Sequence, residues 1–185
     1  MDKNRVTQLT RELLLEIGEN PDREGLRCTP DRVAETWKFL TSGYRSNLNS
    51  LVNGAIFETE ANNMIICRDI EIYSLCEHHL LPFFGTCTIG YIAKRHVMGL
   101  SKLARVADHF SRRLQLQERL TAQIAEAVMD RLDATGVGVV INAKHMCMTM
   151  RGVEKQNSTM TTSSVLGCFQ SDPRSRNEFL TLANG

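Results

Sequence analysis

Two short segments of the chain combine the residue types that bind transition metals: residues 76–79 read Cys-Glu-His-His, and residues 145–147 read His-Met-Cys. A Cys-x-x-His pair is a common zinc half-site. Because the second segment adds one more thiol, the expected ligands are Cys76, His79 and Cys147. A structural zinc site normally has four protein ligands, whereas three leave a coordination position for water or substrate. The ligand count therefore indicates a catalytic metal centre, with imidazoles left over for acid–base chemistry.

The segment around Cys147 predicts a strand. Residues 137–150 are rich in β-branched side chains and follow Gly136. Strict alternation, continued to residue 151, places one set of side chains on one face, namely His145, Cys147, Thr149 and Arg151. The opposite face then carries Met146, Met148 and Met150, a soft apolar surface suited to packing.

The first half-site needs a bend. Cys76 and His79 are an odd number of residues apart, so a straight strand would point their side chains in opposite directions. They can share a metal only if the chain turns there, as the following Leu-Leu-Pro-Phe-Phe-Gly run suggests.

Length and composition describe an ordinary globular protein. The chain has 185 residues, 42% hydrophobic and 23% charged, with a net charge of +1. We expect one domain over residues 1–185, with a helical amino-terminal part at 1–50 and a core at 51–185. The charge balance gives no reason to expect nucleic acid or a membrane as partner. Six cysteines without a signal sequence indicate a reducing, cytoplasmic setting.

Hydrophobic spacing predicts the elements that must position these residues. Helices are expected over residues 6–17, 29–40, 101–114 and 117–132, and from Asp172-Pro173 onward. Thr29 is expected to cap the second helix. Strands are expected over residues 55–60, 64–75, 83–93, 137–150 and 158–169. Because the strand pairs lack crossover helices, the pattern predicts an α+β fold with an antiparallel sheet.

Two further groups suggest a ligand with phosphates and a base. Ser101, Lys102 and Arg105 open a helix, where free N–H groups already favour an anion. The alternative is a capped helix with solvated charges. Arg151, on the same predicted face as Cys147, favours a phosphate-binding site. Glu118 begins the next helix, where a carboxylate is usually a capping group. It could also accept two hydrogen bonds from guanine, and spacing alone does not decide between these roles.

Taken together, these segments resemble the GTP cyclohydrolase I family. The resemblance extends over most of the chain from Thr29 onward, in the family's order. It is carried by Arg68-Asp-Ile, Cys76-Glu-His-His-Leu80, Gly99-Leu-Ser-Lys102, residues 113–121, His145-Met-Cys-Met148, Arg151-Gly152, Thr161-Thr-Ser163 and Glu178-Phe-Leu180.

The resemblance implies the tunnelling fold and a toroidal homodecamer, a dimer of pentamers with active sites at subunit interfaces. It also implies one zinc ion per subunit on the three ligands named above, and conversion of GTP and water to 7,8-dihydroneopterin triphosphate and formate. By motif position, the catalytic residues would be His78, His145 and Ser101. Guanine would be bound by Glu118 and Gln117, and the triphosphate by Lys102, Arg105, Arg151 and Arg32.

The chain departs from the family pattern in the amino-terminal part. Many members have Asp where this chain has Cys28, and Lys where it has Glu35, an acid that would repel a triphosphate near Arg32. Three rival functions remain: a catalytically silent member of the family, another tunnelling-fold enzyme such as a nitrile reductase, and a zinc-stabilised binding module. Retention of both His78 and His145, which the metal does not need, argues against the silent member.

Overall fold

The computed structural model describes residues 1–60 and 62–184, which form two compact units, Met1–Ser42 and Gly43–Gly185. The first unit is a pair of packed helices, α1 (Lys3–Glu16) and α2 (Thr29–Leu40). The predicted cap of α2 is displaced by one residue. Cys28 occupies the N-cap position without a side-chain hydrogen bond, and Thr29 is the first helical residue.

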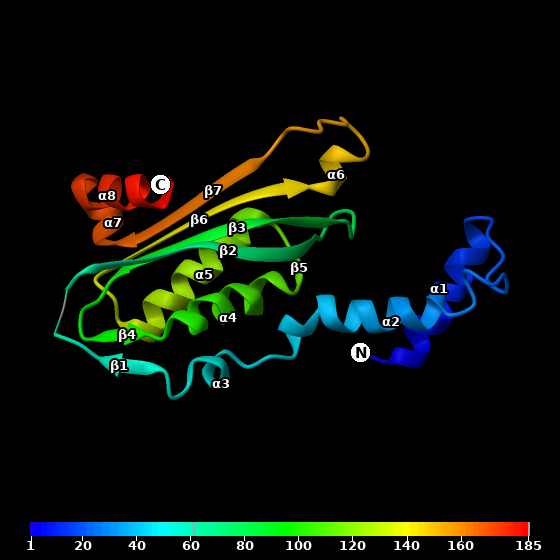
Figure 1. Cartoon of the computed structure of the whole chain (residues 1–185), viewed down its shortest axis with the longest axis horizontal. Helices are drawn as coiled ribbons and strands as arrows, with labels where there is room; N and C mark the ends of the chain where they lie inside the picture. Colours follow the sequence, from blue (N-terminus) through cyan, green and yellow to red (C-terminus); the bar gives the residue numbers. More distant parts are fainter. Residues whose placement is uncertain (61, 185) are drawn as a thin grey trace. The chain divides into compact units, whose positions relative to one another are not determined.

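The second unit is built on a five-stranded sheet with the order β5-β2-β3-β6-β7 (Figure 1). Its strands are β2 (Met64–Cys76), β3 (Pro82–Ile92), β5 (Leu114–Gln115), β6 (Gly136–His145) and β7 (Met160–Gly167). All neighbours are antiparallel except β2 and the short β5, which are parallel. The predicted α+β class with an antiparallel sheet is confirmed.

The remaining elements connect and cover this sheet. A separate two-stranded sheet pairs β1 (Ile56–Glu58) with β4 (His96–Met98). The helices of the unit are η1 (Ser42–Tyr44), α3 (Leu48–Val52), α4 (Leu100–Ser111), α5 (Gln117–Leu132), α6 (Met146–Thr149), α7 (Cys168–Ser171) and α8 (Pro173–Asn184).

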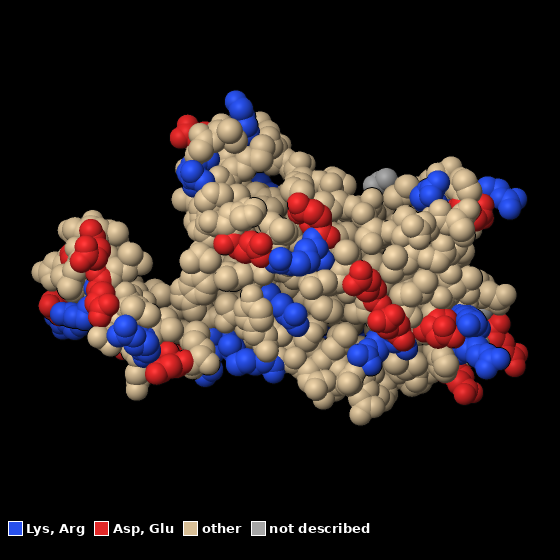
Figure 2. Space-filling model, turned by 180° about the vertical axis from the view of Figure 1, so that it is seen from behind, with Lys and Arg blue, Asp and Glu red and all other residues tan. Residues whose placement is uncertain are grey.

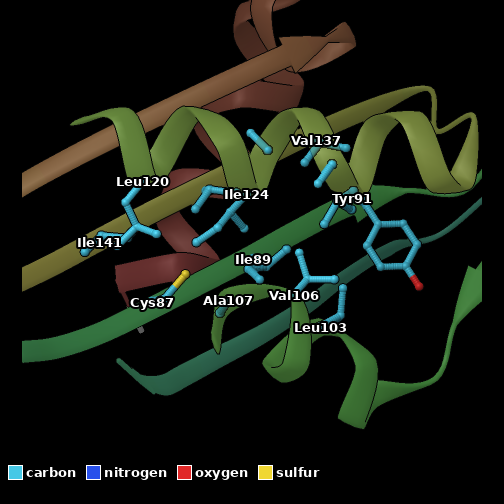
Figure 3. Close-up of a cluster of buried hydrophobic side chains, with 14 of the residues drawn as sticks. Cys87, Ile89, Tyr91, Leu103, Val106, Ala107, Leu120, Ile124, Val137 and Ile141 are labelled. Atoms are coloured by element: carbon cyan, nitrogen blue, oxygen red, sulfur yellow. The ribbon is translucent and has the colours of Figure 1, made fainter. Parts of the chain in front are cut away.

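Alternation along β3 and β6 divides the core between the two faces of the sheet. Figure 3 shows Ile89 and Tyr91 of β3 and Val137 and Ile141 of β6 among apolar side chains of α4 and α5. On the opposite face, glycines let α8 approach the backbone. A Cβ at Gly138 would come within 2.4 Å of the ring of Phe179, and one at Gly90 within 2.7 Å. Both faces at this end of the sheet are therefore closely packed.

The strand predicted over residues 137–150 is too long. β6 ends at His145, and Met146–Thr149 form one turn of helix, in which the Met150 N–H donates to the carbonyl of Met146 at 3.0 Å. A helical turn rotates successive side chains by about 100° rather than 180°. The expected alternation therefore stops at His145. Thr149 is buried, and Met150 is 62% exposed instead of packed.

Charged side chains give the surface no single sign. Figure 2 shows basic and acidic side chains lying close to one another across the face seen from behind. This mixture agrees with the net charge of +1. No helix in the described part of the chain is both long enough and apolar enough to cross a membrane.

Candidate metal centre and active site

The three predicted metal ligands meet at one end of the sheet. One ligand atom from each of Cys76, His79 and Cys147 lies within 4.8 Å of the other two. The Sγ of Cys76 and the Nδ1 of His79 are 3.9 Å apart. Zinc bonds of 2.0–2.3 Å in tetrahedral geometry put ligand atoms about 3.5–3.8 Å from one another. Small side-chain rotations would close the site around such an ion, so the donor set fits zinc in chemistry and in size.

A tight turn between β2 and β3 creates the first half-site. The carbonyl of Cys76 accepts a hydrogen bond from the Leu80 N–H at 2.8 Å, and the Cys76 N–H donates to the Leu81 carbonyl at 2.8 Å. Leu80 adopts a left-handed conformation with φ of 57°. The turn carries His79 back beside Cys76. The predicted bend is thus confirmed, and its cause is local hydrogen bonding.

A charged pair ties this turn to the start of α5. The guanidinium of Arg119 forms an ion pair with Glu77, and its Nε donates to Oε1 of Gln115 at 2.9 Å. The Glu77 N–H also donates to the Gln115 carbonyl at 3.1 Å. The hydrogen bond from Arg119 lowers the pKa of the Glu77 carboxyl, which keeps the pair ionised. Sequence reasoning missed this anchor, although both residues lie inside the motifs it singled out.

The second half-site follows β6. Register pairing sets His145 opposite Phe83 at the end of β3, and α6 then presents Cys147 to the turn. Burial raises the pKa of the Cys147 thiol, and the neighbouring Cys76 thiol adds to the increase. Arg151 opposes this increase.

His145 is held firmly beside the metal ligands. Its ring stacks on that of Phe83, with centroids 4.5 Å apart and an interplanar angle of 5°. Burial lowers the pKa of His145, whereas the carboxylate of Glu118 opposes the shift. His78, in contrast, is exposed, and its ring centroid lies 6.1 Å from that of His79 in an edge-on arrangement.

Gln117 is buried, with an exposed fraction of 1%. Its amide contacts the Ile141 carbonyl, the Met160 carbonyl, the Thr162 hydroxyl and the ring of His145. Every polar atom of this side chain therefore has a partner within the chain. A side chain so placed supports His145, and its contact with guanine, expected from motif position, stays a prediction.

The phosphate-binding residues predicted on α4 lie apart from the metal ligands. Ser101, Lys102 and Arg105 occupy the first half of the helix, where the Nζ of Lys102 donates to the Leu51 carbonyl at 2.7 Å. The opposite end of α4 adjoins β2, where the Ser74 hydroxyl donates to the Arg113 carbonyl. With 12 residues, α4 is roughly 18 Å long at 1.5 Å per residue. Ser101 and Lys102 therefore lie about the length of this helix from its β2 end, and Arg105 lies midway along it.

Arg32 belongs to the first unit and is exposed on α2. The acidic departure near it has a partner, because Glu35 forms an ion pair with Lys3 at 2.9 Å.

Comparison with known proteins identifies the family. A family model described as GTP cyclohydrolase I matches residues 6–184. The chain belongs to the GTP cyclohydrolase I family. Among its relatives, a GTP cyclohydrolase 1 of Leptospira biflexa is 59% identical over 177 residues, covering 96% of this chain and 97% of the relative. A GTP cyclohydrolase 1 of Chromohalobacter salexigens is 57% identical over 175 residues, covering 95% of each chain.

Membership of the GTP cyclohydrolase I family confirms the resemblance found in the motifs and makes the chain a member of an enzyme family. GTP cyclohydrolase I is a metal-binding enzyme, and the cluster of Cys76, His79 and Cys147 could hold a metal ion. One solved structure, of an archaeosine synthase QueF-like protein, has a TM-score of 0.47 at 14% identity over 58% of this chain. This likeness is too low to carry an argument.

Proposed function

We propose that this protein is a zinc-dependent enzyme converting GTP and water to 7,8-dihydroneopterin triphosphate and formate, the entry reaction of folate and pterin biosynthesis. The observation that carries the proposal is the open set of three ligands, with ligand atoms within 4.8 Å of one another. Two imidazoles that the metal does not need adjoin these ligands in the chain: His78 directly precedes His79, and His145 lies in the segment that carries Cys147.

The donor set supports zinc as the resident ion. Two thiols and an imidazole form the mixed sulfur and nitrogen set typical of zinc sites. When bound, a zinc ion supplies Lewis acidity that lowers the pKa of a coordinated water toward about 7. The chain's own residues must then bind the purine, orient it and move protons.

Glu118 and His145 would act on the base. The carboxylate of Glu118, exposed on the first turn of α5, can accept hydrogen bonds from the N1–H and the amino group of guanine. Addition of water at C8 shifts an electron pair to the neighbouring ring nitrogen, which must be protonated. His145, within electrostatic reach of Glu118, would supply that proton. General acid catalysis of this kind contributes about 10²–10⁴-fold to a rate.

His78 and Ser101 would serve the later rearrangement of the ribose. His78 is solvent-exposed next to His79, so its imidazole can exchange protons with a sugar oxygen. Ser101 is proposed to assist it.

The triphosphate would be held by residues of more than one subunit. Arg151 follows Cys147 closely in the chain, whereas Ser101 and Lys102 lie in the first turn of α4 and Arg105 lies midway along it. A second copy of the chain would have to present its α4 to this metal centre. Such sharing would require an oligomer with interfacial active sites, for which we propose the homodecamer. Arg32 is a further candidate phosphate ligand.

The proposal is tested by incubating the purified protein with GTP and measuring formate together with the ultraviolet spectrum of a dihydropterin. Each measurement is repeated after chelation and after restoration of zinc. Equal yields of both products, lost on chelation and regained with zinc, are expected. Formate without the pterin would place the fault at the rearrangement, and absence of turnover by zinc-loaded protein that binds GTP would refute the proposed activity.

A further inference from the structure

The orientation of the Gln117 amide is fixed by two backbone carbonyls. One end of the amide lies 3.0 Å from the Ile141 carbonyl and 2.9 Å from the Met160 carbonyl. Carbonyl oxygens only accept hydrogen bonds, so the atom facing them must be the amide nitrogen. The amide oxygen is therefore the atom that faces the Nε2 of His145, at 2.8 Å.

This orientation determines where His145 carries its proton. An amide oxygen can only accept, so the Nε2 of His145 must be a donor and bear a hydrogen. A neutral imidazole has one N–H, which leaves Nδ1 with its lone pair free. Among the described residues, Nδ1 has no hydrogen-bond partner. Stacking on Phe83 fixes the plane of the ring at the same time.

A second layer of hydrogen bonds holds Gln117 itself. Its amide nitrogen also contacts the Thr162 hydroxyl at 3.1 Å, and that hydroxyl lies 2.6 Å from the hydroxyl of Thr121. The Thr121 hydroxyl donates to the Gln117 carbonyl at 2.7 Å. The network joins α5, β6 and β7, so the Gln117 amide cannot turn without breaking its contacts to β6 and β7.

We propose that Gln117 is the positioning residue of His145: it holds the neutral imidazole in the Nε2–H tautomer and assigns Nδ1 as the atom that exchanges protons with substrate. The inference rests on the proposed function for the catalytic part, while the tautomer stands on geometry alone. It also gives Gln117 a role other than contact with the base.

The proposed proton transfer balances with this tautomer. The imidazolium of His145 breaks its Nδ1–H bond and passes that proton to the purine ring nitrogen that has received the electron pair from C8. The ring is left neutral with hydrogen on Nε2, which is the tautomer that the Gln117 oxygen stabilises. The Gln117 oxygen accepts the Nε2 hydrogen both before and after the transfer, so the proton leaves from Nδ1 and the ring does not change its hydrogen-bond partner.

The test uses the full-length, zinc-loaded protein with labelled histidine, studied by solid-state nuclear magnetic resonance. The signals of His145 are identified by their loss in the variant His145→Gln. Wild-type protein in the neutral form is expected to show a protonated Nε2 and an unprotonated Nδ1. A protonated Nδ1 would overturn the inference, whatever the enzyme's activity.

Two variants separate positioning from general support of the fold. Gln117→Met removes the acceptor of His145, and is expected to mix the two tautomers and to lower kcat about 10²-fold with little change in KM. Thr162→Val removes a hydrogen bond from the same network without touching His145. It is expected to keep the tautomer and to leave kcat close to wild type.

Equal losses of kcat in both variants with an unchanged tautomer would mean that Gln117 is only structural. If Gln117→Met does not fold, the wild-type spectrum decides the tautomer. If wild-type protein has no activity on GTP, the proposed function fails, and the spectra still decide the tautomer that the geometry assigns.

Discussion

The turn between β2 and β3 and the start of α4 were predicted to serve one active site, yet they differ in what a single chain provides. At the turn, ligand atoms of Cys76, His79 and Cys147, from segments far apart in sequence, meet within 4.8 Å. At the start of α4, the Lys102 ammonium contacts the Leu51 carbonyl and no metal ligand. The three metal ligands thus meet within one chain, whereas the phosphate ligands predicted on α4 do not join them there.

Strand pairing brings side chains that are distant in sequence together at the ends of strands. The first turn of a helix, in contrast, groups only residues that are close in sequence. The register of β3 with β6 brings His145 beside Phe83, and so carries Cys147 to the turn. No comparable pairing connects the first turn of α4 with β6. Variants at the metal ligands and at the start of α4 test this difference.

The largest effect is expected at the metal end. Cys147→Ser removes a ligand, so zinc content and activity should both collapse. The loss should exceed the roughly 10–100-fold typical of outer-shell positions. Cys168→Ser is the matched control, because Cys168 is a part-buried thiol in α7 outside the ligand cluster. Metal analysis and turnover are measured on both. Retained activity in zinc-loaded Cys147→Ser would remove this residue from the site.

A second effect distinguishes one-chain from two-chain sites. Lys102→Ala and Cys147→Ser should each be nearly inactive alone. Oligomers containing both variants should regain activity, because some sites would combine an intact metal end with an intact α4 from another copy. Lys94→Ala, a change in an exposed ion pair with Asp133, controls for loss of a lysine. Mixed oligomers that stay inactive would contradict a shared site.

The contact between β6 and α8 should affect the stability of the fold without changing catalysis. Gly138→Ala introduces a Cβ only 2.4 Å from the Phe179 ring, and overpacking of this kind costs about 1–3 kcal/mol of unfolding free energy. Chemical denaturation should show the loss, with kcat and KM unchanged. Adding Phe179→Leu should make the double variant less destabilised than the sum of the single changes. Strict additivity would mean that the two residues do not meet.

The smallest effect is expected in the pH dependence of stability, through His109 near the carboxyl end of α4. His109 lies against Arg113, whose Nη2 is 2.6 Å from its Nε2, and Arg131 lines the same groove. Burial and, secondarily, Arg113 lower the pKa of His109 below 6.5. The native state therefore prefers the neutral ring. The contribution of the neutral ring to the free energy of unfolding is fully present above pH 6.5. This contribution is lost as the pH falls through the native pKa of His109.

Unfolding midpoints measured between pH 7.5 and pH 5 should consequently fall less steeply in His109→Gln than in wild type. Identical slopes would show that His109 is not the group responsible.

Much of the fold could be predicted because its signals are local. The spacing in residues 117–132 matches α5, and apolar runs located β2 and β3 to within a residue or two. The metal ligands could be predicted because cysteine and histidine at this spacing are typical of metal sites. The prediction went wrong where alternation was extended past His145, since one turn of helix has no strong local signature.

The role of Gln117 could not be read from sequence for a different reason. Two of its partners are backbone carbonyls, 24 and 43 residues away. A carbonyl is present at every residue, so residue types do not reveal which one a side chain will reach. Only the placement of β6 and β7 beside α5 does so, and that placement is a property of the tertiary structure.

The turn that closes on Leu80 has a consequence for metal uptake. Because local hydrogen bonds already set Cys76 beside His79, and strand pairing already delivers Cys147, folding bears the entropic cost of gathering the ligands before any ion arrives. An incoming ion would meet three ligands that are already close together. Its affinity would therefore not be reduced by the cost of ordering those ligands.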